Sequence, residues 1–482
     1  MNRGFHVLVF IGLASLSMAS AQLLGSFTAT GNLNQLRQFH TATLLTNGKV
    51  LIAGGFAVAV GWPAWASTEL YDPATGSFTP AGDMTVSRYF HTATLLPDGK
   101  VLIAGGLSSI VGGSFGGLLS SAELYDPSAG TFTPTGEMTT ARASHAAVLL
   151  ANGNVLIAGG VRNEPVATAE LYDPSTGTFS LTGKMLSTGS FTASLLTNGK
   201  VLLEGSYGGR PDDLPVDNEI YDPDTGAFVV AGEKANPLFP ETASLLPNGK
   251  VLVTEIYSCD PSDVAELYDP GTDKSAATPP MTKSRGYSTA TLLPEGKVFV
   301  AGRDFVHFGG SAELYDPATG AFSTDRSLLM DSEEGHTATL LPDGTVLMAG
   351  GWICCGYSVN TAVIYHPLVV VSSPKMFTLS DGRQGAILHA GTSRVVSPDD
   401  PAVAGEALEI YATGLTNGSL VPPQVAIGGR SAQVLFFGDA PGFAGLNQIN
   451  VKVPAGIAAG ASVPVRLFYL ARPSNEVTIG VR

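Results

Sequence analysis

A tripeptide, Tyr-Asp-Pro or in its last copy Tyr-His-Pro, recurs seven times along this chain of 482 residues. Its copies begin at Tyr71, Tyr125, Tyr172, Tyr221, Tyr268, Tyr315 and Tyr365. A glycine-centred turn also recurs seven times, at Gly48, Gly99, Gly153, Gly199, Gly249, Gly296 and Gly344. Self-similarity at a period of roughly 50 residues indicates an array of one supersecondary unit, because neighbouring copies must bury each other's apolar faces.

Each repeat unit contains four short segments with strand character. In the second unit these are residues 91–96, 101–104, 122–125 and 131–133. An Asp-Gly turn joins the first two segments, and this turn type favours a β-hairpin. Four strands in about 50 residues are typical of one blade of a β-propeller. The sequence therefore predicts an all-β fold with seven blades.

The repeat is permuted along the chain, which predicts how the ring closes. A Gly-x-Phe sequence of the fourth-strand type, residues 25–28, precedes the first complete unit, whereas the last unit has no fourth strand of its own. Seven complete blades result only if the N-terminal strand joins the last blade. Such closure removes the open sheet edges that an unclosed ring would expose.

The repeat resembles the kelch repeat. The resemblance rests on a Gly-Gly doublet after strand two, a tyrosine in strand three, an aromatic residue in strand four and Arg-x-x-His before strand one. It covers roughly residues 23 to 368, so we assign residues 22–368 to a kelch-type β-propeller. The units carry Phe where kelch units often carry Trp. The resemblance implies the fold and leaves the function open, because kelch propellers include enzymes and binding scaffolds.

The N-terminus predicts export. Residues 1–21 combine Arg3, an apolar run over residues 7–16 and the small-residue ending Ala19-Ser20-Ala21, which are the parts of a cleavable signal peptide. We therefore expect a periplasmic, cell-surface or extracellular protein without a transmembrane span after cleavage. Residues 50–66 are uncharged, but their glycines and Pro63 favour a buried strand followed by a loop.

Residues 369–482 predict a second domain. Six segments alternate apolar and polar residues between Gly/Pro turns, which favours a small antiparallel β-sandwich. They are residues 408–412, 424–427, 431–437, 448–453, 464–469 and 476–479. Sequences such as Gly445-Leu-Asn-Gln-Ile-Asn-Val451 resemble an Ig-like C-terminal domain that is appended to many exported bacterial proteins. The resemblance implies an accessory or surface-association role.

The charge of the chain limits its partners. With 41 acidic and 26 basic residues, its formal net charge is -15 and no Lys/Arg cluster is present. Nucleic acids and anionic membranes require a positive surface, so neither is an expected partner.

The loops between strands two and three, and between strands four and one, are expected on one face of the ring, because antiparallel strands alternate in direction. These loops vary in length and carry Trp62, Trp65 and Trp352, which are candidate binding residues. Cys354 and Cys355 lie in the same loop as Trp352 and could form a vicinal disulfide, with Cys259 left over or as the alternative partner.

Blades four to six break the repeat at the loop-bearing end. Strand one starts with histidine in four blades, but with Phe191, Glu241 and Ser288 in these three. The Gly-Gly doublet is replaced in the same blades by Glu204-Gly205, Thr254-Glu255 and Gly302-Arg303. We expect a candidate site formed by Glu204, Glu241, Glu255 and Arg303. It could bind a cation or sugar hydroxyls or act as acid and base; the alternative is solvated charge at loop ends.

The repeated histidines, His40, His91, His145 and His336, do not predict a metal centre. A ring around a propeller axis holds them too far apart to share one ion. We expect a repeated structural hydrogen bond instead, with Arg37, Arg88 and Arg142, three residues earlier, as possible partners.

Copper-radical galactose oxidases also combine a kelch propeller with an Ig-like C-terminal domain. That resemblance implies a copper site of two Tyr, two His and a Cys cross-linked to one Tyr, with one His from the C-terminal domain. Here no histidine follows His389, and Tyr365-His366 falls on the opposite face. No cofactor and no metal are therefore predicted. We expect a non-catalytic protein that binds a glycan or protein ligand; the alternative is a polysaccharide hydrolase or lyase that uses carboxylates of blades four to six.

Overall fold

The structure is a computed structural model. It describes residues 25–58, 64–108, 117–161, 166–206, 218–232, 234–235, 239–256, 262–304, 309–324, 334–353, 357–368, 374–415, 421–441, 443, 445–469 and 472–482. These residues contain 39 strands, β1 to β39, and no helix. No helix long and apolar enough to cross a membrane occurs in this part of the chain. The predicted signal peptide, residues 1–21, lies outside it.

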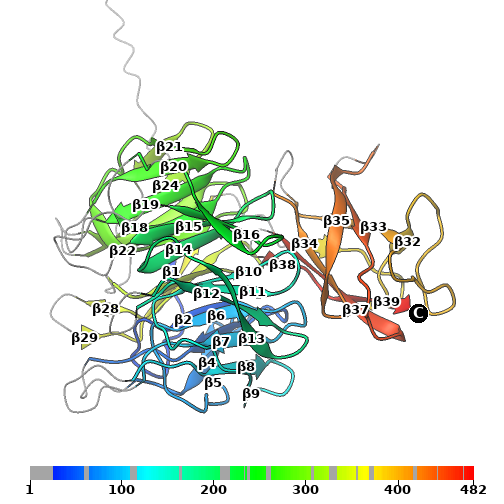
Figure 1. Cartoon of the computed structure of the whole chain (residues 1–482), viewed down its shortest axis with the longest axis horizontal. Coiled ribbons are helices and arrows are strands. Elements are labelled where there is room, and N and C mark those ends of the chain that lie inside the picture. Colours follow the sequence, from blue (N-terminus) through cyan, green and yellow to red (C-terminus); the bar gives the residue numbers. More distant parts are fainter. Residues whose placement is uncertain are drawn as a thin grey trace, which may run out of the picture.

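Seven four-stranded antiparallel sheets form the propeller, and Figure 1 shows them arranged around an axis. Blades one to three are β2 Thr41–Leu44, β3 Val50–Ala53, β4 Thr68–Asp72, β5 Ser77–Pro80; β6 Thr92–Leu95, β7 Val101–Ala104, β8 Ala122–Asp126, β9 Thr131–Pro134; and β10 Ala146–Leu149, β11 Val155–Ala158, β12 Thr168–Asp173, β13 Thr178–Lys184. Blades four to six are β14 Ser190–Leu195, β15 Val201–Ser206, β16 Glu219–Asp222, β17 Ala227–Val230; β18 Phe239–Leu245, β19 Val251–Ile256, β20 Ala265–Asp269, β21 Lys274–Ala277; and β22 Arg285–Leu292, β23 Val298–Asp304, β24 Gly309–Asp316, β25 Ala321–Thr324. Blade seven is β26 Thr337–Leu340, β27 Val346–Ala349, β30 Ala362–His366 and β1 Ser26–Ala29. The innermost strands contact one another in turn all the way round.

The N-terminal strand closes the ring, as its sequence predicts. Strand β1 pairs with β30 in the order β1-β30-β27-β26, with Phe27 opposite Tyr365. Their ring centroids lie 5.1 Å apart, close to the 4.9 Å between Tyr125 and Phe132 inside blade two. A segment more than 300 residues away in the sequence thus supplies the same aromatic pair that the other blades form locally.

Replacing Phe27 with alanine tests this closure. We expect the free energy of unfolding to fall by about 2–4 kcal/mol, slightly below the usual cost of removing a core phenylalanine, because Phe27 is only half-buried. Phe132→Ala is the matched control, since Phe132 is also half-buried against its tyrosine. Urea unfolding should show equal losses for the two variants. A much smaller loss for Phe27→Ala would mean that β1 contributes little to closure.

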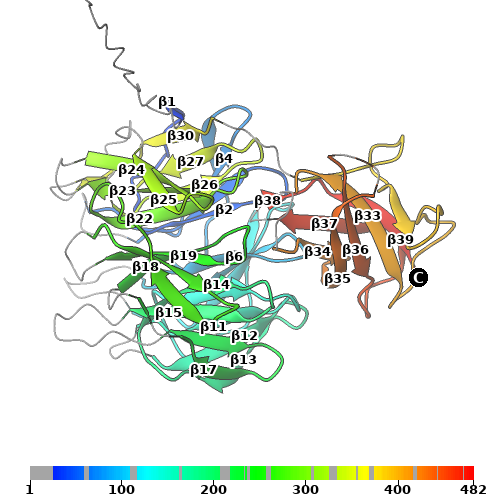
Figure 2. The same ribbon diagram turned by 90° about the horizontal axis from the view of Figure 1, so that it is seen from above.

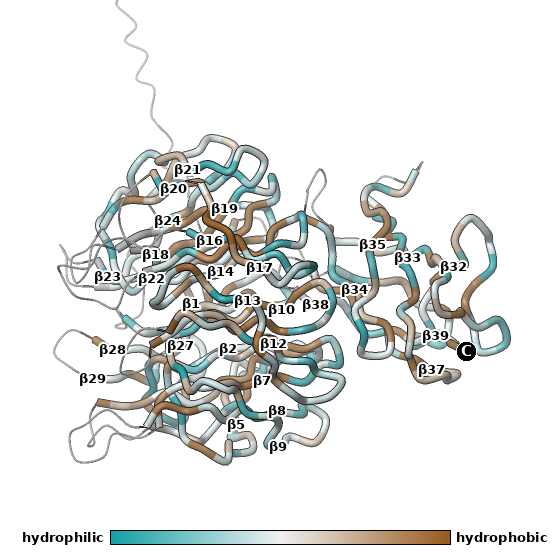
Figure 3. Tube along the Cα trace, in the orientation of Figure 1, coloured by the Kyte–Doolittle hydropathy of each residue, from teal (hydrophilic) through white to brown (hydrophobic). Residues whose placement is uncertain are grey.

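The core lies between neighbouring blades. All seven repeat tyrosines are at most 2% exposed, and the Val-Leu-Ile-Ala type sequence of strand two is buried on both faces. Figure 3 shows these strands as apolar segments inside the propeller. A strand with neighbours on both faces needs a continuous apolar run, and this explains why strand two lacks the alternation of an exposed strand.

The two faces of the propeller differ as expected. The Nζ atom of Lys49, in the turn between strands one and two, lies 3.0 Å from a carboxylate oxygen of Asp72, in the turn between strands three and four. The same turn-to-turn ion pair recurs in three further blades, as Lys200–Asp222, Lys250–Asp269 and Lys297–Asp316. Uniform turns therefore share one face, and the variable loops lie on the other.

The C-terminal part is the predicted β-sandwich. Its main strands are β33 Ala407–Thr413, β34 Gln424–Ile427, β35 Arg430–Asp439, β36 Asn447–Lys452, β37 Gly460–Tyr469 and β39 Val477–Val481, and its short strands are β31 Lys375–Met376, β32 Ile387–His389 and β38 Arg472–Pro473. They enclose one buried apolar cluster. Pairing of β34 with β35 links the two layers into one continuous sheet.

The sandwich contacts the turn face of the propeller, as Figures 1 and 2 show. The guanidinium of Arg466 donates a hydrogen bond of 3.2 Å to the carbonyl oxygen of Pro97, in the first turn of blade two. Gly429 lies against Asp98 of the same turn, and Ser431 lies against Gly153 of blade three. The loop-bearing face is on the opposite side of the ring and stays clear of the sandwich.

Candidate functional site at the axial mouth

Seven equivalent residues surround the propeller axis at the loop-bearing end, and we call them the ring positions. In blade one, Thr41 of strand one pairs with Ala53, the last core residue of strand two. The ring position is the residue just before Thr41, and in every other blade it is the residue just before the equivalent of Thr41. The ring positions are His40, His91, His145, Phe191, Glu241, Ser288 and His336. Because they come from the innermost strands, their side chains determine the chemistry of the mouth.

Four ring histidines form interblade hydrogen bonds. The Nε2 atom of each shares a hydrogen bond with a threonine hydroxyl at the start of strand one in the preceding blade. The pairs are His40–Thr337 at 3.0 Å, His91–Thr41 at 3.0 Å, His145–Thr92 at 2.9 Å and His336–Thr289 at 3.1 Å. The expected structural hydrogen bond is confirmed, but its partner is a threonine, and the suggested arginine partners are wrong.

The arginines form a separate set of contacts. Arg37, Arg88 and Arg142 are fully buried and pair with strand-three glutamates of their own blades. These N–O distances are 2.6 Å for Arg37–Glu69, 2.7 Å for Arg88–Glu123 and 2.8 Å for Arg142–Glu170, and blade six has the pair Arg285–Glu313. Each pair connects the residues that lead into or begin strand one with strand three of the same blade.

The Gly-Gly doublet makes room for the ring side chains. A Cβ atom on Gly54 would lie 2.3 Å from the carbonyl oxygen of Arg88 and 2.8 Å from Cε1 of His91. Gly54 also has a φ of 65°, which favours glycine. Gly105 and Gly159 lie in the same way under His145 and Phe191. The doublet is therefore required because the next blade's ring side chain packs directly on it.

The residues just before the ring positions have an unusual backbone. Phe39, Phe90, Ser144 and Tyr287 have φ angles of 50° to 52°, a conformation that costs about 1–3 kcal/mol for each non-glycine residue. The amide of Phe90 donates to the carbonyl of Phe39 at 3.4 Å, and that of Ser144 donates to Phe90 at 3.0 Å. Strained backbone of this kind is concentrated at ligand-binding and active sites.

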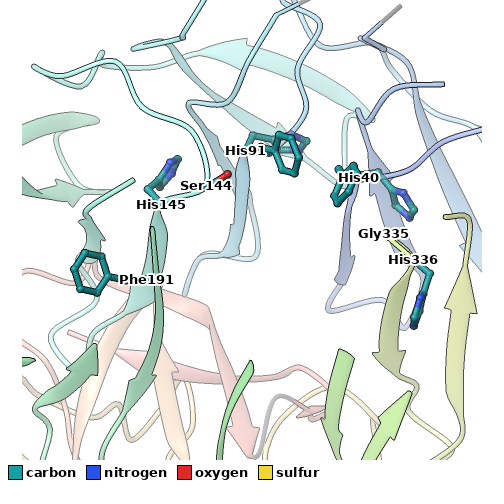
Figure 4. A pocket seen from close by; sticks show the side chains of 9 residues that line it. His40, His91, Ser144, His145, Phe191, Gly335 and His336 are labelled. Atoms are coloured by element: carbon teal, nitrogen blue, oxygen red, sulfur yellow. The ribbon is translucent and has the colours of Figure 1, made fainter. Parts of the chain in front are cut away.

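A cavity of about 350 Å³ opens at this mouth, and Figure 4 shows the side chains that line it in an arc. The lining residues are Phe39, His40, Phe90, His91, Ser144, His145, Phe191, Gly335 and His336. They come from blades seven, one, two, three and four. The centroids of the Phe39 and Phe90 rings lie 4.5 Å apart, so these rings form one half-buried aromatic surface.

The imidazoles of the cavity are uncharged at neutral pH. Burial, reinforced by Arg37 and Arg142 respectively, lowers the pKa of His40 and His145 to about 3. Burial lowers the pKa of His336 to about 4 and that of His91 well below its usual value. None of the described lining residues carries a carboxylate or ammonium group, so the described site favours an uncharged ligand.

In the predicted carboxylate cluster, Glu204 and Glu241 come from adjacent blades, since β15 of blade four contacts β18 of blade five. Glu204 pairs with Thr192 across the sheet, just as Ala53 pairs with Thr41, so it stands one residue before the doublet and not in it. It is 1% exposed, and the placement at a loop end is wrong. A shift of one residue along a strand moves a side chain to the other face, which explains this error. The side chain of Glu255 lies outside the described part of the chain.

Glu241 and Arg303 do belong to one charged cluster, joined by a residue that sequence analysis did not identify. Arg303 forms an ion pair with the buried Glu334. Both carboxylate oxygens of Glu241 accept hydrogen bonds of 2.6 Å from Ser288, one from its amide and one from its hydroxyl. Burial, with a smaller effect of Glu334, raises the pKa of Glu241 to about 7. The carboxylate of Glu241, which belongs to blade five, is thus bound by Ser288 of blade six.

The candidate tryptophans and cysteines contribute less to the described site. The indole N–H of Trp65 donates to the carbonyl of Leu36 at 2.9 Å and fixes the entry to blade one. Trp352, in β28 Trp352–Ile353, pairs with β29 Tyr357–Ser358 and with Glu334, beside the cavity residue Gly335. Trp62, Cys354 and Cys355 lie outside the described residues.

Phe39 and Phe90 are functional candidates that sequence analysis missed. Their signal was present as the residue before each ring histidine, in Phe39-His40 and Phe90-His91. Comparing that position between repeats would have separated three aromatic residues, Phe39, Phe90 and Tyr287, from Ser144 of blade three. The φ angles and the cavity become visible only in three dimensions.

Comparisons with known proteins agree with this architecture. The kelch motif matches residues 142–186, which contain all four strands of blade three. A fungal alcohol oxidase of the AA5 family, solved in complex with copper, is similar in fold, with a TM-score of 0.60 and 17% sequence identity. The match covers 95% of this chain and 99% of the oxidase chain, so both proteins share the propeller and the sandwich. No curated protein matches the sequence.

The described side chains of this protein do not fit a copper site at the mouth. Each ring histidine uses Nε2 for a threonine, and the repeat tyrosines are buried inside the blades. Among the described residues, no three His, Cys, Asp or Glu side chains are grouped as a metal site requires. What the chain shares with the oxidase is the fold: it is a kelch-type seven-bladed β-propeller followed by a C-terminal β-sandwich.

Proposed function

We propose that this protein is an exported binding protein whose axial mouth recognises an uncharged carbohydrate. The observation that carries the proposal is the cavity of about 350 Å³ lined by three phenylalanines and four neutral histidines. Its volume lies in the range of small-ligand sites, about 300–1,000 Å³, and such sites combine aromatic walls with a few polar groups. Sugars match this lining because they present C–H faces to aromatic rings and hydroxyl groups to a polar side chain such as Ser144.

The surrounding structure supports the same role. Interblade hydrogen bonds hold the ring positions, and the backbone before them keeps an unusual positive φ. The cavity is therefore largely preformed, and a preformed site loses less entropy on binding. The sandwich contacts the other face and leaves the mouth open. A surface-association role of the sandwich would therefore direct the mouth away from the surface to which the protein is attached.

The enzymatic alternative depends on carboxylates in one cleft. Paired catalytic carboxylates of glycosidases lie about 5–10 Å apart on either side of the scissile bond. Glu241 of blade five has both carboxylate oxygens hydrogen-bonded to Ser288, and Glu204 of the adjacent blade four is 1% exposed, so neither carboxylate is presented to a cleft. The described structure therefore favours binding over polysaccharide cleavage by this set of residues.

Binding should depend on the aromatic surface of the mouth. Phe90→Ala is expected to weaken binding of a neutral oligosaccharide by about tenfold or more, because a wall of the cavity is removed. A glycan array should identify ligands of the purified protein, and isothermal titration calorimetry should measure the loss. Tyr357→Ala is the control, since Tyr357 is an exposed aromatic residue that does not line the cavity. Equal affinities for wild type and Phe90→Ala, with both proteins folded, would contradict the proposal.

A further inference from the structure

Four consecutive blades place the residue before the ring position in one backbone row. In blades seven, one, two and three these residues are Gly335, Phe39, Phe90 and Ser144, and their φ angles lie between 50° and 65°. From the second residue on, the amide of each donates to the carbonyl of the one before it, at 3.1, 3.4 and 3.0 Å in turn. The backbone of Ser144 is therefore placed beside Phe90 as that of Phe90 is placed beside Phe39.

The side chains of this row change at Ser144. The rings of Phe39 and Phe90 pack with their centroids 4.5 Å apart, and a phenylalanine at position 144 would add a third ring to the row. The chain has a hydroxymethyl group there instead, and Ser144 is half-buried and lines the cavity with Phe90. The cavity of about 350 Å³ can hold a ring at this place, because a cavity of about 150 Å³ is already enough to bind benzene.

Ser144 is also the side chain that can form a hydrogen bond to a ligand at this place. The ring histidines share Nε2 with threonines, and their Nδ1 atoms are buried. Among the described lining residues, the remaining polar side chain is that of Ser144. Figure 4 shows its hydroxyl in the arc between His145 and His91. A ligand beside Phe90 thus meets an aromatic surface and one serine hydroxyl.

We infer that a ring of the carbohydrate takes the place beside Phe90 that a third phenyl ring would fill, and that Ser144 orients it there through a hydrogen bond. A sugar ring suits this place because its C–H groups can pack on the Phe90 ring while a hydroxyl group reaches Ser144. The serine hydroxyl can donate or accept, so it can pair with any sugar hydroxyl. This inference rests on the proposed function and adds the residues that position the ligand.

Ser144→Phe tests whether this place is the binding site. The substitution adds the side chain that blades one and two carry at the same φ, so the protein itself fills the place. The probes are cellotetraose, xylotetraose and mannotetraose, measured by titration calorimetry. We expect the affinity for the one that wild type binds best to fall about tenfold or more, while the melting temperature stays the same or rises. Ser180→Phe, on the exposed outer strand of the same blade, is the matched control and should bind as wild type does.

Ser144→Ala separates the hydrogen bond from the room that the small side chain provides. The place stays open, but the hydroxyl is lost. Removal of one neutral hydrogen bond should weaken binding of the same tetrasaccharide about two- to tenfold, which is less than the loss for Ser144→Phe.

The outcomes separate this inference from the proposed function. If wild type binds none of the three tetrasaccharides and no other neutral glycan, the proposed function fails and this inference fails with it. If wild type binds one of them and folded Ser144→Phe binds it equally well, carbohydrate recognition stands and the assigned place is wrong. If Ser144→Ala binds as tightly as wild type, Ser144 does not orient the ligand and the inference is also wrong.

Discussion

Replacing Arg88 with methionine is expected to lower the free energy of unfolding by about 3–5 kcal/mol, the usual cost of removing one partner of a buried ion pair. Arg88 is fully buried, and its Nη1 atom donates to the carbonyls of Gly105 at 2.8 Å and Ser121 at 3.1 Å. Its Nη2 atom lies 2.7 Å from Glu123, which is 1% exposed. Methionine keeps most of the side-chain length but leaves the Glu123 carboxylate buried without a countercharge.

Two further variants show whether the unpaired charge of Glu123 causes this loss of stability. Arg88→Met/Glu123→Gln should recover part of it, because the remaining amide is neutral and can still accept the hydrogen bond from the amide of Thr85. Lys49→Met removes an exposed ion pair to Asp72 and should cost less than about 1 kcal/mol. Urea unfolding measures all three proteins. A loss for Arg88→Met no larger than that for Lys49→Met would show that the buried pairs do not stabilise the blades.

Acidification is expected to destabilise the propeller between about pH 6.5 and pH 3. The ring histidines have an ordinary pKa of 6.5 in the unfolded chain, whereas burial lowers the folded-state pKa of His40 and His145 to about 3 and that of His336 to about 4. In this window the unfolded chain binds protons that the folded chain does not. Stability is therefore fully present above pH 6.5 and falls by about 1.4 kcal/mol per pH unit for each such histidine.

Glu241 acts in the opposite direction over part of this range. Its pKa is about 7 in the folded protein against 4.5 in the unfolded chain. The stability that the protonated carboxyl contributes is therefore lost as the pH rises from about 4.5 to 7. Four histidines outnumber this single carboxyl, and we expect net destabilisation by acid. Glu241→Gln should increase stability at pH 7 more than at pH 4.5.

The chain itself supplies the variant for the acid test. Between blades three and four, Ala146 and Phe191 stand where other junctions have threonine and histidine, and both lie in one buried apolar cluster. Thr92→Ala/His145→Phe copies this pair at the junction before it and removes one titrating histidine. Unfolding free energies measured by urea titration between pH 4 and pH 8 should depend less steeply on pH below about pH 6.5, by about 1.4 kcal/mol per pH unit, and equally above it. An unchanged slope would show that His145 is not held neutral by burial.

Most of the fold could be predicted because each repeat carries the same local signals. The glycine-centred turn and the Tyr-Asp/His-Pro turn mark strand ends in all seven units, and the Gly-Gly doublet does so in four, so errors in one copy are corrected by the others. Closure by β1 followed from counting strands. Strands of the sandwich were found by their apolar alternation, and the six predicted segments correspond to β33, β34, β35, β36, β37 and β39.

The site was predicted only in part, because its contacts join different blades. His91 and its partner Thr41 are 50 residues apart, while the suggested partner Arg88 is only three residues away and turns to Glu123. Glu334, which links Glu241 with Arg303, belongs to the next blade again. Sequence proximity therefore identified the wrong partner, because hydrogen bonds at the mouth run around the ring and not along the chain.

The sequence by itself determined the number of blades, the strand that closes the ring, the loop-bearing face and the seven ring positions, since these depend on periodicity and local turn chemistry. Only the tertiary structure decided the partner of each ring side chain, the burial that keeps the imidazoles neutral and the gathering of Phe39, Phe90 and Phe191 at one mouth. These properties arise where seven similar units meet around one axis, and the distances between units are set by the packing of the whole ring.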